Sequence, residues 1–598
     1  LRLRVDLTAE KLYTLSKGSK DILGKLQSDV VLKFYFSSSS AEMPMNLKTY
    51  ADQVQDLLKE YQRAGKGRVT LEAYDPKPDS DSEEWAQRYG IEPQQTNPFG
   101  QPVYFGLVAV DASGENAQVI AGFNPRTEST LEYDVTRLIT RVAWPEKPVI
   151  GVMSSLSVLG QPQNPMMMMQ RRRQQQDQGW AAFQDLRKDY TVREIPTTAE
   201  EIEADVKTLI VIHPKDLTDK TLFALDQFVL RGGRLIVCVD PFSVADFEAN
   251  QQQQNPMMMQ MGGGQAGPST LGKLFDAWGV TFDTSKIVAD MSCSTKLNGG
   301  NGRVEENPAF LSLGAANMAK SDLLTAQLSQ VMLPFAGALS ANTPKEITFT
   351  PLITTSKDNA CLVDQMNAQF GMSAMRSQLK PDGVQRVLAA RLQGEFKTAF
   401  PKGPDEASTN AVANLLTKGT GTVMIFGDVD FLNDRFCVQV MNTLFGPMAQ
   451  PINDNLTLFG NVVEQFAGRE ELIGVRSRGQ FNRPFDKVDA LEVAAMKKWQ
   501  AQEEELEKTL QETRQRLSEL QQHKSGNERL ILSKEQQAEI EQFRKTQAET
   551  SKQLKEVRKN LNREIEQLGL TLKVVNIALI PLLVIVFGIY RGAQRKKR

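Results

Sequence analysis

The sequence predicts an α/β protein built from successive parts, and three observations support this fold class. Short apolar runs alternate with amphipathic segments up to about residue 485, as in sheets covered by helices. Two long segments without Pro or Gly interruptions follow, and an apolar run then leads into a basic end. The predicted parts are a thioredoxin-like N-terminal domain without redox cysteines (1–145), a doubly wound Rossmann-like domain with inserts (146–485), an antiparallel coiled-coil hairpin (486–569), a transmembrane helix (570–590) and a basic cytoplasmic tail (591–598).

The composition excludes several classes of protein. Of the 598 residues, 41% are hydrophobic and 24% are charged, which is ordinary for a globular chain. The net charge of −2 provides no attraction for nucleic acid. The two histidines, His213 and His523, argue against histidine-based catalysis and histidine-rich metal sites. Four cysteines are far apart and form no CxxC pair, so we predict no metal site, no cofactor and no catalytic residue: Cys238, Cys293, Cys361 and Cys437.

The first 145 residues show the element order of a thioredoxin-like domain. Strands are predicted at 29–37, 68–75, 103–111 and 117–121, and helices at 44–63, 80–89 and 128–142. The resulting order is β-α-β-α-β-β-α. Pro102 precedes the third strand, where that fold places a cis-proline, but no cysteine occurs before Cys238. We therefore expect a domain used for packing or binding rather than for redox chemistry.

The central segment reads as a parallel sheet with acidic residues at one edge. Apolar runs predict strands at 149–153, 208–213, 234–240 and 422–426, with a return to the sheet near 384–400. Ligands of such sheets bind beyond the carboxyl ends of the strands. Asp240, Asp428 and Asp430 follow two of these strands and form the candidate ligand pocket. The alternative for these aspartates is helix capping and turn formation.

Two low-complexity inserts interrupt this segment, at 165–178 and 250–264. Their Met and Gln residues are typical either of an adaptable binding surface or of a loop without a fold of its own. Residues 301–350 show no clear period and are interpreted as an inserted lobe.

The segment 486–569 predicts two helices joined by a turn. Apolar residues recur at spacings of three and four on both sides of Ser525, Gly526 and Asn527, which are typical turn residues. The arm is either a solvated stalk that acts as a spacer or lever, or a docking site for a partner.

The C-terminal end predicts a membrane anchor. The run from Leu572 to Tyr590, which includes Pro581, approaches the ~20 apolar residues that span a bilayer. The positive-inside rule places the following cations in the cytoplasm and the bulk of the chain outside it. The alternative is a buried core helix with a basic end. The cytoplasmic anchor residues are Arg591, Arg595, Lys596, Lys597 and Arg598.

Several motifs in a fixed order resemble one family. They include YDVTRLITRV, KPVIGVMSSL, RGGRLIVCVDPF, VLAARLQGEFKTAF, FGDVDFLNDRF and NLTLFGNVVEQFAG. Together they resemble the GldG-like family, the auxiliary, substrate-binding-like component of gliding-motility-type ABC transporters. The resemblance implies an ABC permease and an ABC ATPase as partners, a position at the bacterial inner membrane with the bulk of the chain in the periplasm, and a further membrane helix before Leu1. It implies no catalytic residue.

Three functions are therefore weighed. The first is a non-catalytic, membrane-anchored subunit of an ABC transporter, which contacts the lipid bilayer, the transporter subunits and, as an open alternative, a second copy of itself. The chain has no P-loop and is not the ATPase. The second is a free-standing extracytoplasmic protein that binds a glycan, lipid or peptide, or acts as a scaffold. The third, a hydrolase, lacks a readable nucleophile–base pair.

Overall fold

The structure is a computed structural model, and it places part of the chain. It describes residues 14–475 except 41–42, 95–100, 161–178, 254–266, 299–303, 370–371, 376–377, 405–414, 444–445, 470–471 and 474, together with residues 545, 549 and 552. The chain divides into two compact units, Leu1–Phe481 and Asn482–Arg598. The predicted hairpin (apart from three positions), membrane span, basic tail and insert 165–178 lie outside the described residues. None of the helices described combines the length and apolar character needed to cross a membrane.

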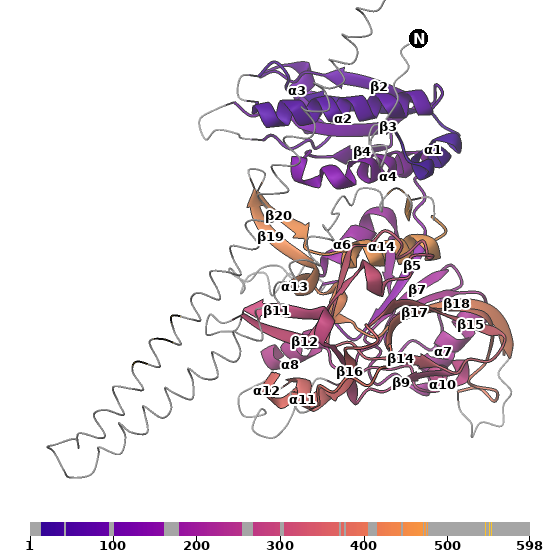
Figure 1. Ribbon diagram of the computed structural model, residues 1–598. Helices are drawn as coiled ribbons and strands as arrows, with labels where there is room; N and C mark the ends of the chain where they lie inside the picture. The colour runs from indigo at the N-terminus through magenta and orange to yellow at the C-terminus, as the bar shows by residue number, and fades with distance from the viewer. Residues whose placement is uncertain are drawn as a thin grey trace, which may run out of the picture. The chain divides into compact units, whose positions relative to one another are not determined.

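The N-terminal domain is a four-stranded sheet with helices on both faces (Figure 1). Its strands are β1 (Val30–Phe36), β2 (Val69–Tyr74), β3 (Phe105–Asp111) and β4 (Ala117–Ile120), and its helices are α1 (Lys17–Gly24), α2 (Met45–Ala64), α3 (Asp81–Arg88) and α4 (Leu131–Ala143). The strand order is β2-β1-β3-β4; β2 runs parallel to β1, and β3 runs antiparallel to β1 and to β4. From β1 onward the elements occur in the predicted order.

Alternation along β1 explains how the helices are distributed. Side chains of alternate strand residues point to opposite faces of a sheet. Leu32 and Phe34 accordingly join the apolar cluster that contains α2 and α4, whereas Tyr35 joins the cluster that contains Ala86 of α3. The peptide bond before Pro102 is trans, because no cis peptide bond occurs in the described residues, so the expected cis-proline was wrong.

The central domain is organised by a nine-stranded sheet with the path β6-β5-β7-β8-β18-β17-β14-β9, and β15 also pairs with β17. The strands are β5 (Val149–Ser154), β6 (Thr191–Glu194), β7 (Thr208–Ile212), β8 (Arg234–Cys238), β9 (Val280–Phe282), β14 (Leu339–Ala341), β15 (Ile347–Thr354), β17 (Val387–Lys397) and β18 (Lys418–Phe426). The first five strands of the path are parallel, and the others are antiparallel to their neighbours.

The expectation of an all-parallel sheet was therefore wrong at one side. The predicted return of the chain near 384–400 is β17, but it precedes β18 in the chain and lies beside it. The two strands run antiparallel along their length, with Ala389 opposite Phe426 and Lys397 opposite Lys418.

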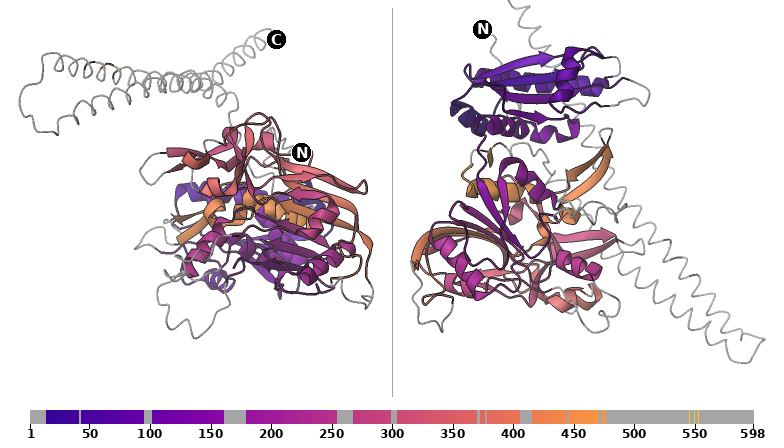
Figure 2. Two further views of the ribbon diagram at one scale, coloured as in Figure 1. Left: turned by 90° about the horizontal axis from the view of Figure 1, so that it is seen from below. Right: turned by 180° about the vertical axis from the view of Figure 1, so that it is seen from behind.

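Helices cover both faces of the parallel part (Figure 2). On one face, α6 (Ala181–Asp189) and α14 (Asn455–Phe466) pack on residues such as Ile210 and Ile236. On the other face, α7 (Asp219–Leu230) and α10 (Lys273–Trp278) pack on Leu209 and Val237. All five residues of β7 are buried, which explains why the parallel strands read as continuous apolar runs rather than as alternating ones.

The residues between β8 and β18 supply the antiparallel strands and smaller sheets. A pair is formed by β10 (Lys286–Asp290) and β16 (Ala360–Asp364), and a three-stranded sheet by β11 (Ser294–Asn298), β12 (Val304–Gly314) and β13 (Gln330–Pro334). The helices there are α8 (Val244–Gln253), α11 (Gln365–Gln369) and α12 (Met372–Met375). After β18 come α13 (Asp434–Cys437) and the pair β19 (Val438–Thr443) and β20 (Gly446–Pro451). The insert at 250–264 thus begins as the last turn of α8, and the segment 301–350 contains β12, β13, β14 and the first part of β15.

Buried charges join α4 to α6. Arg137 of α4 donates to the carboxylate of Asp189, and Arg141 Nε donates to Asp189 Oδ1 at 2.6 Å. The side chains of Arg137 and Asp189 are only 11% and 8% exposed. Asp185 also pairs with Arg137 at 3.1 Å, but its side chain is 46% exposed. Burial raises the pKa of Asp189, but the guanidinium groups of Arg137 and Arg141 lower it by more. The pKa of Asp189 therefore lies below its usual value.

We predict that Asp189→Asn destabilises the chain far more than Asp185→Asn. The first change removes the buried negative charge that faces two guanidinium groups, and should lower the free energy of unfolding by about 3 kcal/mol or more. The second removes a half-exposed partner, at a cost of less than about 1 kcal/mol. Urea denaturation of both variants measures the difference, and equal losses would show that the ion pair does not stabilise the junction.

Candidate functional site

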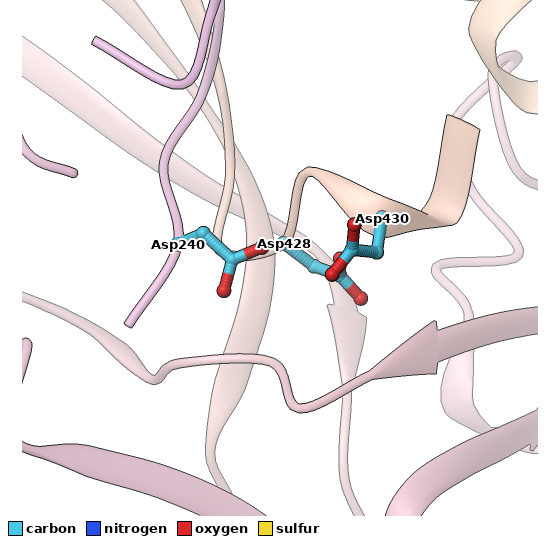
Figure 3. Close-up of side chains that lie close together, drawn as sticks. All are labelled: Asp240, Asp428 and Asp430. Atoms are coloured by element: carbon cyan, nitrogen blue, oxygen red, sulfur yellow. The ribbon is translucent and has the colours of Figure 1, made fainter. Parts of the chain in front are cut away.

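The three aspartates of the predicted pocket lie together at the carboxyl edge of the large sheet (Figure 3). Asp240 follows β8, and Asp428 and Asp430 follow β18. The two strands are parallel neighbours in which Phe426 pairs with Cys238, so the residues after them emerge side by side. One carboxylate oxygen from each aspartate lies within 4.8 Å of the other two. All three residues are 0% exposed.

Backbone amides hold Asp240 and Asp430 in place. Asp240 Oδ1 accepts from the amide of Phe242 at 2.8 Å, and Oδ2 accepts from the amide of Val429 at 2.9 Å. Asp430 accepts from the amides of Val244 and Ala245 at the start of α8. These bonds join the end of β8, the end of β18 and the amino end of α8.

Asp428 is held by fewer contacts. Its Oδ1 accepts from the amide of Phe431 at 3.2 Å, whereas its Oδ2 is buried and has no hydrogen-bond partner. The backbone of Gly427 packs closely on that of Gly337. The amide of Gly337 donates to the carbonyl oxygen of Gly427 at 2.7 Å, and a Cβ at position 427 would lie 2.5 Å from the carbonyl oxygen of Gly337. A glycine is therefore required immediately before Asp428.

The surroundings favour the neutral form of these acids. Burial, reinforced by the charge of Asp430, raises the pKa of Asp240 well above its usual range. Burial and the charges of Asp240 and Asp430 do the same for the pKa of Asp428. Burial raises the pKa of Asp430 to about 7, although the amides of Val244 and Ala245 oppose the rise. In the described part of the chain, no ion pair includes any of the three; nearby cations pair elsewhere, as Lys215 does with Asp246.

The structure thus brings the three predicted residues together but gives them no solvent-facing surface. The amide bonds to Asp430 are the helix-capping contacts that the sequence analysis kept as an alternative. An enclosed group of this kind has no room for a glycan, lipid or peptide. A ligand of these side chains would have to be the size of an ion.

A second polar cluster at the same edge was missed by sequence reasoning. His213 follows β7 with a φ of 51°, is 0% exposed, and neither ring nitrogen has a hydrogen-bond partner. Its Nε2 lies 3.6 Å from Oδ2 of Asp246 in α8, and Lys215 Nζ donates to the same oxygen at 3.0 Å. Burial raises the pKa of Asp246, but His213 and Lys215 lower it by more, to about 2. The histidine at the end of a strand was visible in the sequence; its acidic partner on α8 was not, because this helix adjoins the low-complexity insert.

A cavity of about 290 Å³ lies beside the α4–α6 ion pair. Tyr133, Arg137 and Asp185 line it together with Glu464 of α14, which accepts from the hydroxyl of Tyr133 at 2.7 Å. The sequence contains no signal for this cavity, because its lining comes from three helices and the β19–β20 pair, which are far apart in the chain.

Comparison with known proteins identifies the class of the chain. Residues 147–462, which are more than half of the 598, match a family of ABC transport auxiliary components described as "ABC-type uncharacterized transport system". The chain belongs to this family. Residues 9–110 also match a domain of unknown function (DUF7088). The candidate aspartates therefore all lie in the region that defines the auxiliary family.

Individual relatives are distant. An uncharacterized protein of Borreliella burgdorferi is 22% identical over 492 residues, which are 79% of this chain and 84% of that protein. Among solved structures, the exo-β-1,4-mannosidase Op5Man5 of Opitutaceae bacterium strain TAV5 is 10% identical, with a TM-score of 0.18, over 64% of this chain and 46% of its own. A GH42 β-galactosidase, Gan42B of G. stearothermophilus, is 13% identical with a TM-score of 0.15, over 51% and 42%. The auxiliary chain thus spans less than half of either glycosidase, and likenesses this weak indicate nothing about its activity.

We predict that Asp246 contributes stability that depends on pH. Because its pKa falls from 3.8 to about 2 on folding, the contribution is complete above about pH 4 and is lost as the pH falls through 2. Asp246→Asn should therefore lower the free energy of unfolding by about 2 kcal/mol at pH 7 and by progressively less below pH 4. Urea denaturation at a series of pH values measures this.

Asp219→Asn is the matched control, since Asp219 pairs with Lys273 and both side chains are about half exposed. It should change stability by less than about 1 kcal/mol at any pH. A loss in Asp246→Asn that is the same at pH 3 and pH 7 would contradict the assigned ion pair.

Proposed function

We propose that this chain is a non-catalytic, membrane-anchored subunit that assembles with the permease and the ATPase of an ABC transporter. The observation that carries the proposal is the match of residues 147–462 to the auxiliary family. ABC transport requires an ATPase and a membrane-spanning path. The chain contains no P-loop to bind ATP, so it would depend on a partner for hydrolysis.

The sequence beyond the described residues supports anchoring in the membrane. Between residues 574 and 590 only Asn576 is polar before Tyr590, and cations follow immediately. On this basis we assign the bulk of the chain to the periplasmic side of a bacterial inner membrane and the basic end to the cytoplasm. The order of motifs further supports a place within the GldG-like branch of the family.

The N-terminal domain supports a binding or packing role. Its strand order, β2-β1-β3-β4 with a single parallel pair, agrees with a thioredoxin-like domain, and no cysteine occurs before Cys238. We therefore propose that it contacts a partner protein rather than catalysing thiol exchange. The segment 486–569, read as a helical hairpin, would connect this extracytoplasmic part to the membrane span and so carry movement from the transporter.

We predict that the full-length chain co-purifies from its native membrane with an ABC ATPase and a multi-span permease in near-stoichiometric amounts. Mild-detergent extraction followed by quantitative mass spectrometry measures this. Extraction of a variant that ends before residue 570 is the control, since it lacks the predicted anchor. Recovery of the full-length chain alone, in several detergents and after crosslinking, would favour a free-standing binding protein instead.

We predict that a flexible Gly-Ser insertion beside Gly569 abolishes function in a deletion strain without preventing assembly. The insertion interrupts the predicted join between hairpin and span, and so the transmission of movement. The same insertion at Gly526, in the predicted turn of the hairpin, is the matched control and should be tolerated. Full complementation by both insertions, with intact co-purification, would exclude a lever and leave a spacer.

A further inference from the structure

When ionised, the acidic cluster at the carboxyl edge of the large sheet carries a charge that the described side chains do not balance. Asp240, Asp428 and Asp430 are 0% exposed, and no ion pair of the described residues includes them. Buried carboxylates are costly unless a counter-charge, a metal ion or protonation offsets their charge. The family assignment and the proposed transport role supply no explanation for three such groups in contact.

One atom of the cluster points to a ligand. Asp428 Oδ2 is enclosed by the protein and accepts no hydrogen bond. Both oxygens of Asp240 accept an amide hydrogen, and so do both oxygens of Asp430. These bonds fix the direction of the carboxylates of Asp240 and Asp430. Asp430 Oδ1 also accepts from the Ser243 hydroxyl at 3.2 Å, whereas Asp430 Oδ2 and both oxygens of Asp240 keep a second lone pair. Such orienting contacts are typical of the second shell around metal ligands.

We propose that Asp240, Asp428 and Asp430 bind a hard divalent cation: Ca²⁺, Mg²⁺ or Mn²⁺. The donor set consists of carboxylate oxygens without a thiolate or imidazole, which these ions prefer. Oxygens bound to one such ion at about 2.0–2.6 Å lie no more than about 5 Å apart. The three donor oxygens lie within 4.8 Å of one another, which is inside that limit.

The cation would be structural. Because the three residues are fully buried, the chain must close around the ion as it folds, and no ligand position faces solvent. The ion would tie together the end of β8, the end of β18 and, through the amides of Val244 and Ala245 bound to Asp430, the start of α8. This inference extends beyond the sequence analysis, which predicted no metal site, and it does not rest on the proposed transport function.

Metal analysis of the full-length chain tests the proposal. The protein is purified in detergent with Ca²⁺, Mg²⁺ and Mn²⁺ present, desalted and measured by inductively coupled plasma mass spectrometry. We expect near-stoichiometric retention of one of these ions. A chelator should lower the melting temperature, and the retained ion, added alone, should restore it.

Asp428→Asn removes the charge on the unpartnered oxygen with little change in size. Its loss of affinity should exceed the about 10–100-fold typical of second-shell changes, and its melting temperature should not respond to chelator. Asp226→Asn is the matched control, because Asp226 is equally buried in the same domain but bonds to Thr398 and Ala399. It should retain the ion.

Two results would overturn the proposal. One is a wild-type chain without any of the three ions and with a melting temperature that neither chelator nor added ion changes; the carboxyl groups would then share protons. The other is equal retention of the ion by Asp428→Asn and wild type, which would show binding elsewhere. The first result comes from the wild-type chain alone, so it would overturn the proposal even if Asp428→Asn does not fold.

Discussion

The parallel pairing of β8 with β18 is the constraint on which the rest of the central domain depends. Val237 pairs with Ile425, so the chain from residue 239 to 417 forms one long insertion between two neighbouring strands, and it adds β9, β14, β15 and β17 to the same sheet. The entropy cost of closing a loop grows only logarithmically with its length, which makes so large an insertion affordable. Burial of both strands on both faces offsets that cost, since β8 and β18 contribute to the two large apolar clusters.

This pairing also explains why polar groups gather at one edge. Parallel strands end at the same side of a sheet, so residues that follow β7, β8 and β18 meet although they are far apart in the chain. The amino end of α8 lies at this edge. Asp430 accepts a hydrogen bond from an amide at the start of this helix, and Asp246 in its first turn accepts one from Lys215. The helix α8 thus contributes to both clusters, because its backbone amides bind Asp430 and the side chain of Asp246 binds Lys215.

The sequence predicted what depends on local pattern and missed what depends on distant pairing. The predicted strands β5, β7, β8 and β18 were confirmed, because buried parallel strands leave continuous apolar runs in the sequence. The three aspartates were expected together because they follow two of these strands. Burial of those aspartates was not predicted, since enclosure comes from the inserted segments. The strands within 301–350 were not predicted; they pair antiparallel, β12 with β13 and β15 with β17. The pairing of His213 with Asp246 was not predicted, because it depends on a left-handed backbone at His213 that no sequence pattern indicated.

The contrast between the domain core and the α4–α6 junction bears on how an auxiliary subunit would move. The large sheet is held by apolar packing on both faces, which resists gradual deformation. The junction has only a small apolar cluster around Tyr133 and includes charged and hydroxyl groups, among them Arg137, Asp189 and the bond from Tyr133 to Glu464, beside a cavity. Polar interfaces of this kind are typical of domains that shift relative to one another. If ATP hydrolysis in a partner changes the shape of this subunit, we expect the change to occur at this junction, because the sheet and its acidic edge would move as one body.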